Sequence, residues 1–448
     1  MLAFAACRKS EGITTDSNAK LSFSADTLLF DTVFTASGST NKRIKVYNPN
    51  LKAVNISDIK LSGGAGSYFS LIINGQSINQ KSNLQIDGKD SISIYVKVTI
   101  DANNQTEPFI AQDSILFSTN GNKQAIALIA YGQNAIFINN QTITSNTRWT
   151  SALPYIIYKS VTVAQQATLT ILPGTKVLFH GNSAMNIKGK LLASGTSDSP
   201  ILFSGDRTES RYAEQPGQWN GIHFYSSSSG SKLHYSVIKN AVIGITLDSL
   251  STTGLPKLTL TSSIIKNMTI AGFVGYRAEL DAFNNLFYNG GQYLLYGVAG
   301  GRYNLKQNTF AGYNTKVARR TPSVYFSDSG NERPSNNLNV IFTNNIVWGS
   351  LTEEFLMEKK ANTTTQVAVN NNAIKTLLKT YEGNFNLLNI DPVFIDPLSN
   401  NFMLQDNSPV INKGYDLSAD PAFGIFLNKD LNNESRAFPS ELGCYEHN

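Results

Sequence analysis

Apolar and polar residues alternate along several short segments in the first third of the chain. In residues 91–100 every second residue is Ile or Val, and Ser, Tyr, Lys and Thr stand between them. A period of two indicates a strand with one face in a core and the other in water. Weaker segments of the same kind lie at residues 28–34, 42–47, 113–118 and 124–131. About seven such strands in roughly 115 residues predict a β-sandwich.

The pattern changes after Asn139, where apolar strands of three to five residues alternate with small polar turns. The clearest internal repeat pairs Ser236–Asn240 with Ser263–Asn267, 27 residues further on. Asn-led strands then follow at steps of 22, 23, 37 and 27 residues. One rung of a parallel β-helix for each step is the simplest account of this spacing.

The polar residue that leads each repeat has a structural explanation. Equivalent strands of successive rungs stack about 4.8 Å apart, so equivalent side chains line up. Buried Ser and Asn side chains can then satisfy one another by hydrogen bonding. We therefore predict a corner column of stacked polar residues, made of Ser236, Ser263, Asn285, Asn308, Asn345 and Asn372.

Composition supports an all-β protein and excludes some partners. Only 15% of the 448 residues are charged, while 19 Tyr and 24 Phe are present, as in turn-rich β proteins. The net charge of +5 is spread along the chain without the Lys/Arg clusters that nucleic-acid binding requires. No stretch has the 18 or more apolar residues of a membrane span, so we expect a soluble body without nucleic-acid partners.

The N-terminal residues resemble the end of a bacterial lipoprotein signal peptide, in which small residues precede a Cys that is acylated after cleavage. Met1–Cys7 carries this resemblance, and charged residues follow at 8–11, as in surface-export signals of Bacteroidetes-type lipoproteins. Because no basic region and no full hydrophobic region precede Cys7, we expect the true start to lie upstream. The resemblance implies lipidation at Cys7 and an outer-membrane, surface-facing location. An ordinary free Cys in a disordered terminus is the alternative.

Two further resemblances cover most of the chain. Residues 43–49, 68–69 and 130–134 resemble immunoglobulin-like domains related to Hydin and major sperm protein, which implies a spacer or binding module. Residues 167–175, 189–195, 199–203 and 217–222 resemble the opening coils of right-handed β-helix proteins related to pectate lyases. Segments between residues 389 and 446 resemble the closing part of bacterial surface β-helix proteins.

These observations give one expected domain order and fold class. Residues 1–20 are a signal remnant and tether, and residues 21–136 form an immunoglobulin-like β-sandwich. Residues 137–448 form a right-handed parallel β-helix with a C-terminal closing segment. The fold class is therefore all-β, and the fold alone does not define an activity.

A search for catalytic residues finds no pattern that can be assigned. Asp248, Glu279 and Asp281 do not recur at rung spacing, so we interpret them as solvated surface carboxylates rather than a cation site. The turns at residues 221–223 and 237–239 do not match the Asp, His and Arg-Ile-Lys pattern of polygalacturonases. The four His residues lack metal-ligand spacing. No catalytic residue, metal or cofactor is therefore predicted, and Cys444 is expected to be a small buried hydrophobe.

Tyr and Arg residues are enriched between Tyr276 and Arg333. Exposed Tyr rings stack on sugar faces and Arg binds carboxylates, so this region is a candidate groove for an acidic glycan. Ordinary packing along a β-helix is the competing interpretation. The candidate binding residues are Tyr288, Tyr293, Tyr296, Arg302, Tyr303, Arg319 and Arg320. Residues 351–360 are expected to form a short amphipathic helix.

Three functions are compatible with these features. The first is a monomeric, non-catalytic surface lipoprotein that binds a glycan or another surface component and contacts the membrane only through its lipid. The second is a polysaccharide lyase or glycoside hydrolase acting on an acidic polysaccharide, which fold analogy alone suggests. The third is an adhesive protein that presents the long surface of a solenoid to a protein partner.

Overall fold

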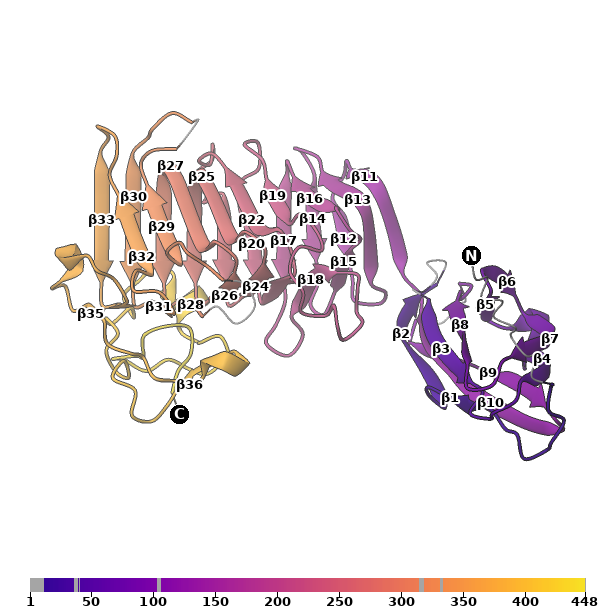
Figure 1. The fold of residues 1–448 in the computed structure, drawn as a ribbon. Helices are drawn as coiled ribbons and strands as arrows, with labels where there is room; N and C mark the ends of the chain where they lie inside the picture. The colour runs from indigo at the N-terminus through magenta and orange to yellow at the C-terminus, as the bar shows by residue number, and fades with distance from the viewer. Residues whose placement is uncertain are drawn as a thin grey trace, which may run out of the picture. The chain divides into compact units, whose positions relative to one another are not determined.

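The fold is described from a computed structural model covering residues 12–35, 39, 41–102, 106–313, 318–330 and 333–447 (Figure 1). The chain divides into two compact units, residues 1–135 and residues 136–448. Cys7 lies outside the described residues. Among the described residues, no helix is long and apolar enough to cross a membrane.

The N-terminal unit contains two five-stranded sheets around one core. The first sheet contains, in spatial order, β1 (Ser22–Phe23), β3 (Lys42–Tyr47), β8 (Ser91–Val98), β5 (Phe69–Ile73) and β6 (Gln76–Ile78). The second contains β2 (Thr27–Phe34), β10 (Asn122–Gln133), β9 (Phe109–Thr119), β4 (Val54–Leu61) and β7 (Gln80–Ile86), and a short helix, η1, spans Gly64–Gly66. The alternating segments predicted from the sequence all form strands. The strands exceed the predicted seven because short edge strands such as β1 and β6 have little alternation.

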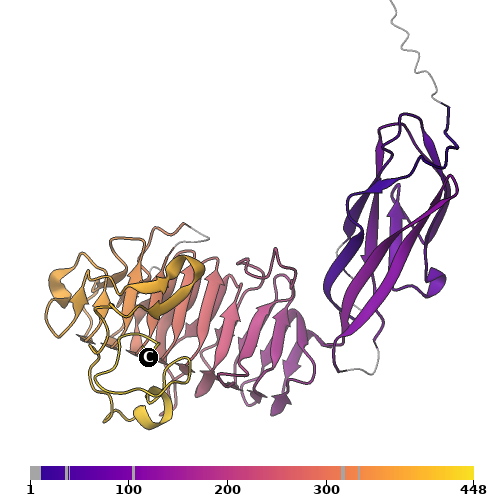
Figure 2. The same cartoon turned by 90° about the horizontal axis from the view of Figure 1, so that it is seen from below.

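The C-terminal unit is built on a 25-stranded sheet whose strands pair in parallel, consistent with a β-helix. We call this unit the coil. Each strand pairs mostly with the strand three positions further along, so each rung contributes one strand to each of three faces (Figures 1 and 2). Large apolar side chains from all three faces fill a single interior, in which Phe203, Leu260 and Phe342 are fully buried.

The three faces are named A, B and C. Face A contains β15 (Lys176–Phe179), β18 (Ile201–Gly205), β21 (Ser236–Lys239), β24 (Ile264–Met268), β26 (Leu286–Gly290), β28 (Thr309–Gly312), β31 (Ile346–Gly349), β34 (Ala373–Ile374) and β35 (Leu387–Leu388). Face B contains β16 (Ala184–Ile187), β19 (Ile222–Phe224), β22 (Ile243–Asp248), β29 (Val324–Ser327) and β32 (Phe355–Glu358). Face C contains β12 (Thr147–Trp149), β14 (Thr168–Ile171), β17 (Lys190–Ser194), β20 (Ser231–His234), β23 (Leu258–Thr261), β30 (Leu338–Thr343) and β33 (Thr365–Asn370).

Four long strands turn a corner and belong to two faces. β11 (Ile136–Ile143) and β13 (Tyr155–Val163) pass from face A to face B. β25 (Ala271–Phe283) and β27 (Tyr293–Lys306) pass from face B to face C. Their corners lie at residues with positive φ, such as Lys159 and Arg277, where the chain bends without ending the strand.

The predicted corner column is confirmed. From Ser236 to Asn372, each backbone N–H donates to the side-chain oxygen of the next column residue at 2.8–3.0 Å. Every member is at most 1% exposed, so the column satisfies polar groups that water cannot reach. Asn386 accepts from the N–H of Asn372 at 3.0 Å and extends the column by one residue that the sequence spacing did not indicate.

A second set of corner residues holds the C-terminal segment. The residue before each column member has positive φ, and Asn, the commonest residue there, tolerates that conformation better than most. The side chain of Asn284 donates to the carbonyls of Phe426 and Lys429, and Asn344 exchanges two hydrogen bonds with the backbone of Tyr415. These side chains therefore tie the C-terminal segment to the coil.

The C-terminal segment covers the outer side of the last rungs of face A. Its elements, all after β35, are β36 (Phe394–Asp396), η3 (Pro397–Ser399), β37 (Asn401–Leu404) and η4 (Phe423–Leu427). The short helix η2 (Lys379–Tyr381) precedes β35 and places Tyr381 in the coil core. Phe402 and Leu442 pack against Tyr288 and Trp348 of the coil. Cys444 is fully buried in the same cluster, as predicted, and burial raises the pKa of its thiol to about 12.

The short helix predicted at residues 351–360 is wrong. Residues Phe355–Glu358 instead form β32, which pairs with β29 on face B. Phe355 enters the coil core and Glu354 is fully buried beside it. Rung pairing therefore decides the conformation of this segment.

Candidate functional site

Tyr303 lies inside the coil and is not exposed at all. Two glycines from neighbouring rungs, Gly275 and Gly297, leave room for its ring, because a Cβ at either position would lie 2.8 Å from Tyr303 atoms. Tyr303 therefore cannot contact a glycan, and its prediction as a binding residue is wrong.

Two other predicted binding residues are also buried. Tyr288 packs against Phe402 beneath the C-terminal segment and is 8% exposed, and this burial raises the pKa of its hydroxyl. Arg319 forms an ion pair with Glu354 at 2.6 Å, and neither side chain is exposed. Neither Tyr288 nor Arg319 can bind a ligand from solvent, so these predictions are wrong too.

The structure brings Tyr293 and Tyr296 together on face B, where Tyr325 joins them. Their ring centroids lie 4.5 Å apart for Tyr293 and Tyr296, and 5.3 Å apart for Tyr296 and Tyr325. Partial burial raises the pKa of all three hydroxyls, and that of Tyr325 donates to Glu358 at 2.6 Å. Because these rings pack against one another, less of their surface is available to a ligand. Their role is therefore better explained by packing than by binding. Arg320 is exposed outside this cluster.

Arg302 lies on face C, and its neighbours form a regular outward-facing array on three strands. The rows run across β27, β30 and β33. In each row, a residue of β27 is paired with one of β30 and that one with a residue of β33, and successive rows are two residues apart along the strands. Most residues between the rows, such as Leu305 and Phe342, are buried in the core, whereas Val367 on the last strand is 40% exposed. The array consists of the rows Arg302-Asn339-Gln366, Asn304-Ile341-Ala368 and Lys306-Thr343-Asn370.

Two adjoining cavities lie over this array and share Ile341. One, of about 360 Å³, is lined by Arg302, Asn304, Asn339 and Gln366 among others. The other, of about 430 Å³, extends over Lys306, Thr343 and Asn370. We call the two cavities together the face-C groove. Ile341 is 46% exposed at their junction, so an apolar surface is surrounded by amides.

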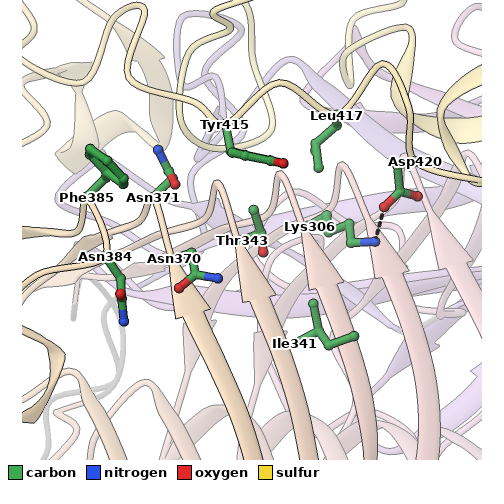
Figure 3. A pocket seen from close by; sticks show the side chains of 10 residues that line it. All are labelled: Lys306, Ile341, Thr343, Asn370, Asn371, Asn384, Phe385, Tyr415, Leu417 and Asp420. Atoms are coloured by element: carbon green, nitrogen blue, oxygen red, sulfur yellow. Dashed lines mark hydrogen bonds and ion pairs between the residues drawn. The ribbon is translucent and has the colours of Figure 1, made fainter.

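Residues from later in the chain form the rim of the face-C groove (Figure 3). Tyr415 and Leu417 come from the C-terminal segment and lie across from Thr343 and Ile341. Phe385 stands at the other end and is 82% exposed, while Tyr415 is 59% exposed. Two exposed aromatic rings therefore border a floor of amide and hydroxyl groups.

The cations of the groove are paired with carboxylates. Arg302 donates through Nε to Glu279 at 2.7 Å, and one of its terminal nitrogens lies 2.6 Å from the same carboxylate. Lys306 forms an ion pair with Asp420, drawn as a dashed line in Figure 3. Asp281 lies 4.0 Å from Arg302, and burial raises the pKa of its carboxyl group.

Asp248, Glu279 and Asp281 are partly exposed carboxylates on the outside of the coil, and each lies near an Arg side chain. Asp248 lies on face B, where His223 is 2.8 Å and Arg333 3.8 Å away. Partial burial opposes ionisation of Asp248, but the hydrogen bond to His223 and the charge of Arg333 outweigh it and lower the pKa of Asp248. Across the described residues, no group of three or more His, Cys, Asp or Glu side chains is placed to hold a metal ion.

Of the nine residues in the outward-facing array, the candidates predicted from the sequence include only Arg302. Ile341, Gln366 and Asn370 were missed because each is an isolated polar or apolar residue in a short strand. The available signal was the ladder spacing itself. Counting back two residues from Asn308, Asn345 and Asn372 gives Lys306, Thr343 and Asn370, one complete row of the array.

The sequence matches no protein-family model and no curated protein. Solved structures give only partial similarity. A family 123 glycoside hydrolase from Clostridium perfringens has 13% identity and a TM-score of 0.20, over 29% of this chain and 30% of that chain. The ASH/PapD-like domain 7 of human CEP192 has 9% identity and a TM-score of 0.18, over 30% of this chain and 96% of that domain. The VesB protease of Vibrio cholerae has 13% identity and a TM-score of 0.19, over 27% and 33%.

These matches span less than a third of this chain. The chain covers about a third of the hydrolase and protease chains it resembles. Similarity this low carries no argument about activity. What can be said of the class of protein is that it is an all-β chain with a large parallel sheet.

Proposed function

We propose that this protein is a non-catalytic, glycan-binding surface lipoprotein that holds its ligand in the face-C groove. The observation that carries the proposal is the array of amide side chains around Ile341, bordered by Phe385 and Tyr415. Protein binding sites for small ligands are typically concave and largely apolar, with a few placed polar groups.

The chemistry of the groove suits a sugar. Asn339, Gln366 and Asn370 each offer both a donor and an acceptor, which matches a hydroxyl group that does the same. Exposed aromatic rings such as Tyr415 offer a flat apolar face for the C–H face of a pyranose ring. Because the array stands on three paired strands, its side chains are held at fixed spacing before a ligand arrives.

The rest of the architecture fits a surface protein. We propose that the coil is a right-handed β-helix of the pectate-lyase type, because parallel crossover connections are right-handed in about 98% of cases. The two five-stranded sheets of the N-terminal unit suit an immunoglobulin-like spacer. A lipid on Cys7 would hold a monomer at the outer membrane, facing outward. Mass spectrometry of native protein should then find Cys7 acylated, and an unmodified thiol would refute the anchor.

A glycan array followed by calorimetry tests the groove. Tyr415→Ala and Phe385→Ala are each expected to weaken binding about fivefold, from loss of about 1 kcal/mol of ring contact. Gln366→Ala should cost about two- to tenfold, the value of a hydrogen bond. Leu377→Ala is the matched control, since Leu377 is 71% exposed and does not line the groove. No binding to any glycan, or equal losses in the control, would refute the proposal.

A hydrolase or lyase is a second candidate, favoured by Asp281. Burial raises the pKa of this carboxyl group, and Glu279 lies two residues away on the strand that adjoins the groove. Glycoside hydrolysis typically uses a pair of carboxyl groups on either side of the scissile bond. Incubation with neutral and uronic-acid polymers decides this point. Product release that Asp281→Asn abolishes would establish an enzyme.

A further inference from the structure

We infer that the face-C groove selects an uncharged glycan and disfavours acidic ones. The inference rests on the proposed function and specifies the ligand class of the same site. It depends on the state of the two cations in the groove, Arg302 and Lys306. An acidic glycan would need at least one of them free to bind its carboxylate.

Arg302 is already used within the protein. Its Nε and one terminal nitrogen both face Glu279, so one of the two edges with which the guanidinium can hold a carboxylate in two hydrogen bonds is occupied, and its charge is balanced within the protein. The backbone N–H of Ser251 also donates to Glu279 at 3.0 Å, which holds the carboxylate in place. Displacing Glu279 would leave that carboxylate, 14% exposed, without its charge partner.

Lys306 is used in the same way at the other end of the array. Its ammonium contacts Asp420, and the two side chains are only 10% and 15% exposed. Asp420 also accepts from the backbone N–H of Ala422, so the C-terminal segment fixes its position. A uronic acid at this end would meet Asp420 beside the paired Lys306.

The other side chains of the array carry no charge. Asn304 and Thr343 are uncharged, and the amides of Asn339, Gln366 and Asn370 offer dipoles that bind hydroxyl groups. The two cations are matched by Glu279 and Asp420, and Asp281 lies 4.0 Å from Arg302 in addition. Among the described lining residues, each cation already has a carboxylate partner. The carboxylate of an acidic glycan would therefore lose its hydration without gaining a cation. Discrimination then comes from the cost imposed on the wrong ligand.

The test uses a glycan array on which each uronic-acid oligosaccharide is paired with its carboxyl-reduced, neutral counterpart. The natural protein is expected to bind the neutral member of a pair at least about tenfold more tightly. Glu279→Gln keeps the shape of the side chain but frees the charge of Arg302, and Asp420→Asn does the same for Lys306. Each variant should gain about fivefold or more in affinity for uronic acids, and the gain should shrink as salt is added.

Glu358→Gln is the matched control, because Glu358 pairs with Lys360 on face B, away from the groove. It makes the same change of charge and should leave the preference unaltered. Natural protein that prefers uronic acids overturns the inference while the proposed function stands. Absence of binding to both members of every pair overturns the proposed function itself. Unchanged preference in both groove variants, with native Trp fluorescence, overturns the role of the ion pairs.

Discussion

Asn308 occupies the middle of the corner column, and its side chain forms hydrogen bonds to the rungs on both sides. Its side-chain oxygen accepts from the backbone N–H and the amide of Asn285, at 3.0 and 2.9 Å. Its amide donates to the carbonyl of Ala282 at 2.9 Å and to the side chain of Asn345 at 2.9 Å. The side chain is fully buried, so no water can replace these partners. Asn308→Ala is therefore a direct test of what the corner column contributes to the coil.

The cost can be estimated from the groups that lose their partners. The N–H of Asn285 is left buried without its acceptor, which costs about 1–3 kcal/mol. The bonds to Ala282, Asn345 and the amide of Asn285 are each worth about 0.5–1.5 kcal/mol. Because these losses share one site and partly overlap, we expect Asn308→Ala to lower the free energy of unfolding of the coil by about 3–5 kcal/mol.

Chemical denaturation followed by Trp fluorescence measures this value. All three Trp residues, at 149, 219 and 348, are buried in the coil, so their emission reports on the coil without a contribution from the N-terminal unit. Asn308→Ser is a graded variant, since Ser263 already accepts a backbone N–H at 3.0 Å in the same column. It should restore the lost acceptor and cost about 1–2 kcal/mol.

Asn139→Ala is the matched control, because Asn139 is exposed on the first strand of the coil. It should change the free energy of unfolding by less than about 0.5 kcal/mol. If Asn308→Ala costs no more than this control, the column does not stabilise the coil and the reasoning is refuted. A cost for Asn308→Ser equal to that of Asn308→Ala would show that the acceptor for the Asn285 N–H is unimportant.

Three further predictions concern buried groups, each checked by denaturation of the coil. Arg319→Met should cost about 3–5 kcal/mol, because Glu354 stays buried without its charge partner, and adding Glu354→Gln should recover part of the loss. Gly297→Ala should cost about 1–3 kcal/mol, because its methyl group would lie 2.8 Å from the Tyr303 ring. Burial and the hydrogen bond to Glu441 outweigh the opposing charge of Arg436 and raise the pKa of Glu446 from 4.5 to about 9, so the folded chain holds a proton that the unfolded chain releases. Stability should therefore fall as pH rises from about 4.5 to about 9, and Glu446→Gln should flatten that fall.

The rung register could be predicted from the sequence because its signal repeats. Each step from Ser263 to Asn372 places a small polar residue before a short apolar strand, and packing requires that combination at every rung. One Asn would carry little information, whereas a column of them defines a register. The strand of residues 91–100 was predictable for a similar reason, since its alternation continues over the whole strand.

Tyr303 shows where this reasoning stops. From Arg302 to Lys306, polar outward-facing residues alternate with apolar or aromatic inward-facing ones, as in any half-buried strand. Tyr303 falls on the inward side together with Leu305. A Tyr can stand inside the coil only because Gly275 and Gly297 lack side chains, and those glycines lie 28 and 6 positions away in the sequence. Both glycines are visible in the sequence, but only the strand register shows that they lie beside the Tyr303 ring.

The helix expected at residues 351–360 failed for a physical reason of the same kind. Apolar residues at positions 351, 355 and 356 fit a helical period, and local pattern alone cannot separate it from a short strand. Pairing with β29 supplies hydrogen bonds along β32, and the buried Arg319–Glu354 pair fixes the turn before it. Tertiary contacts thus override a weak local preference.

The face-C groove and the corner column are formed by neighbouring residues of the same rungs. In each of three rungs, consecutive residues provide a groove side chain, a residue with positive φ and a column member. The amides of Asn308, Asn345 and Asn372 donate to the carbonyls of Lys306, Thr343 and Asn370 respectively. Between them, Asn344 holds the backbone of Tyr415 at the rim. The buried column therefore fixes the spacing of the groove floor, and the neighbouring residues fix its rim, so the stability of the coil and the shape of the groove depend on the same hydrogen bonds.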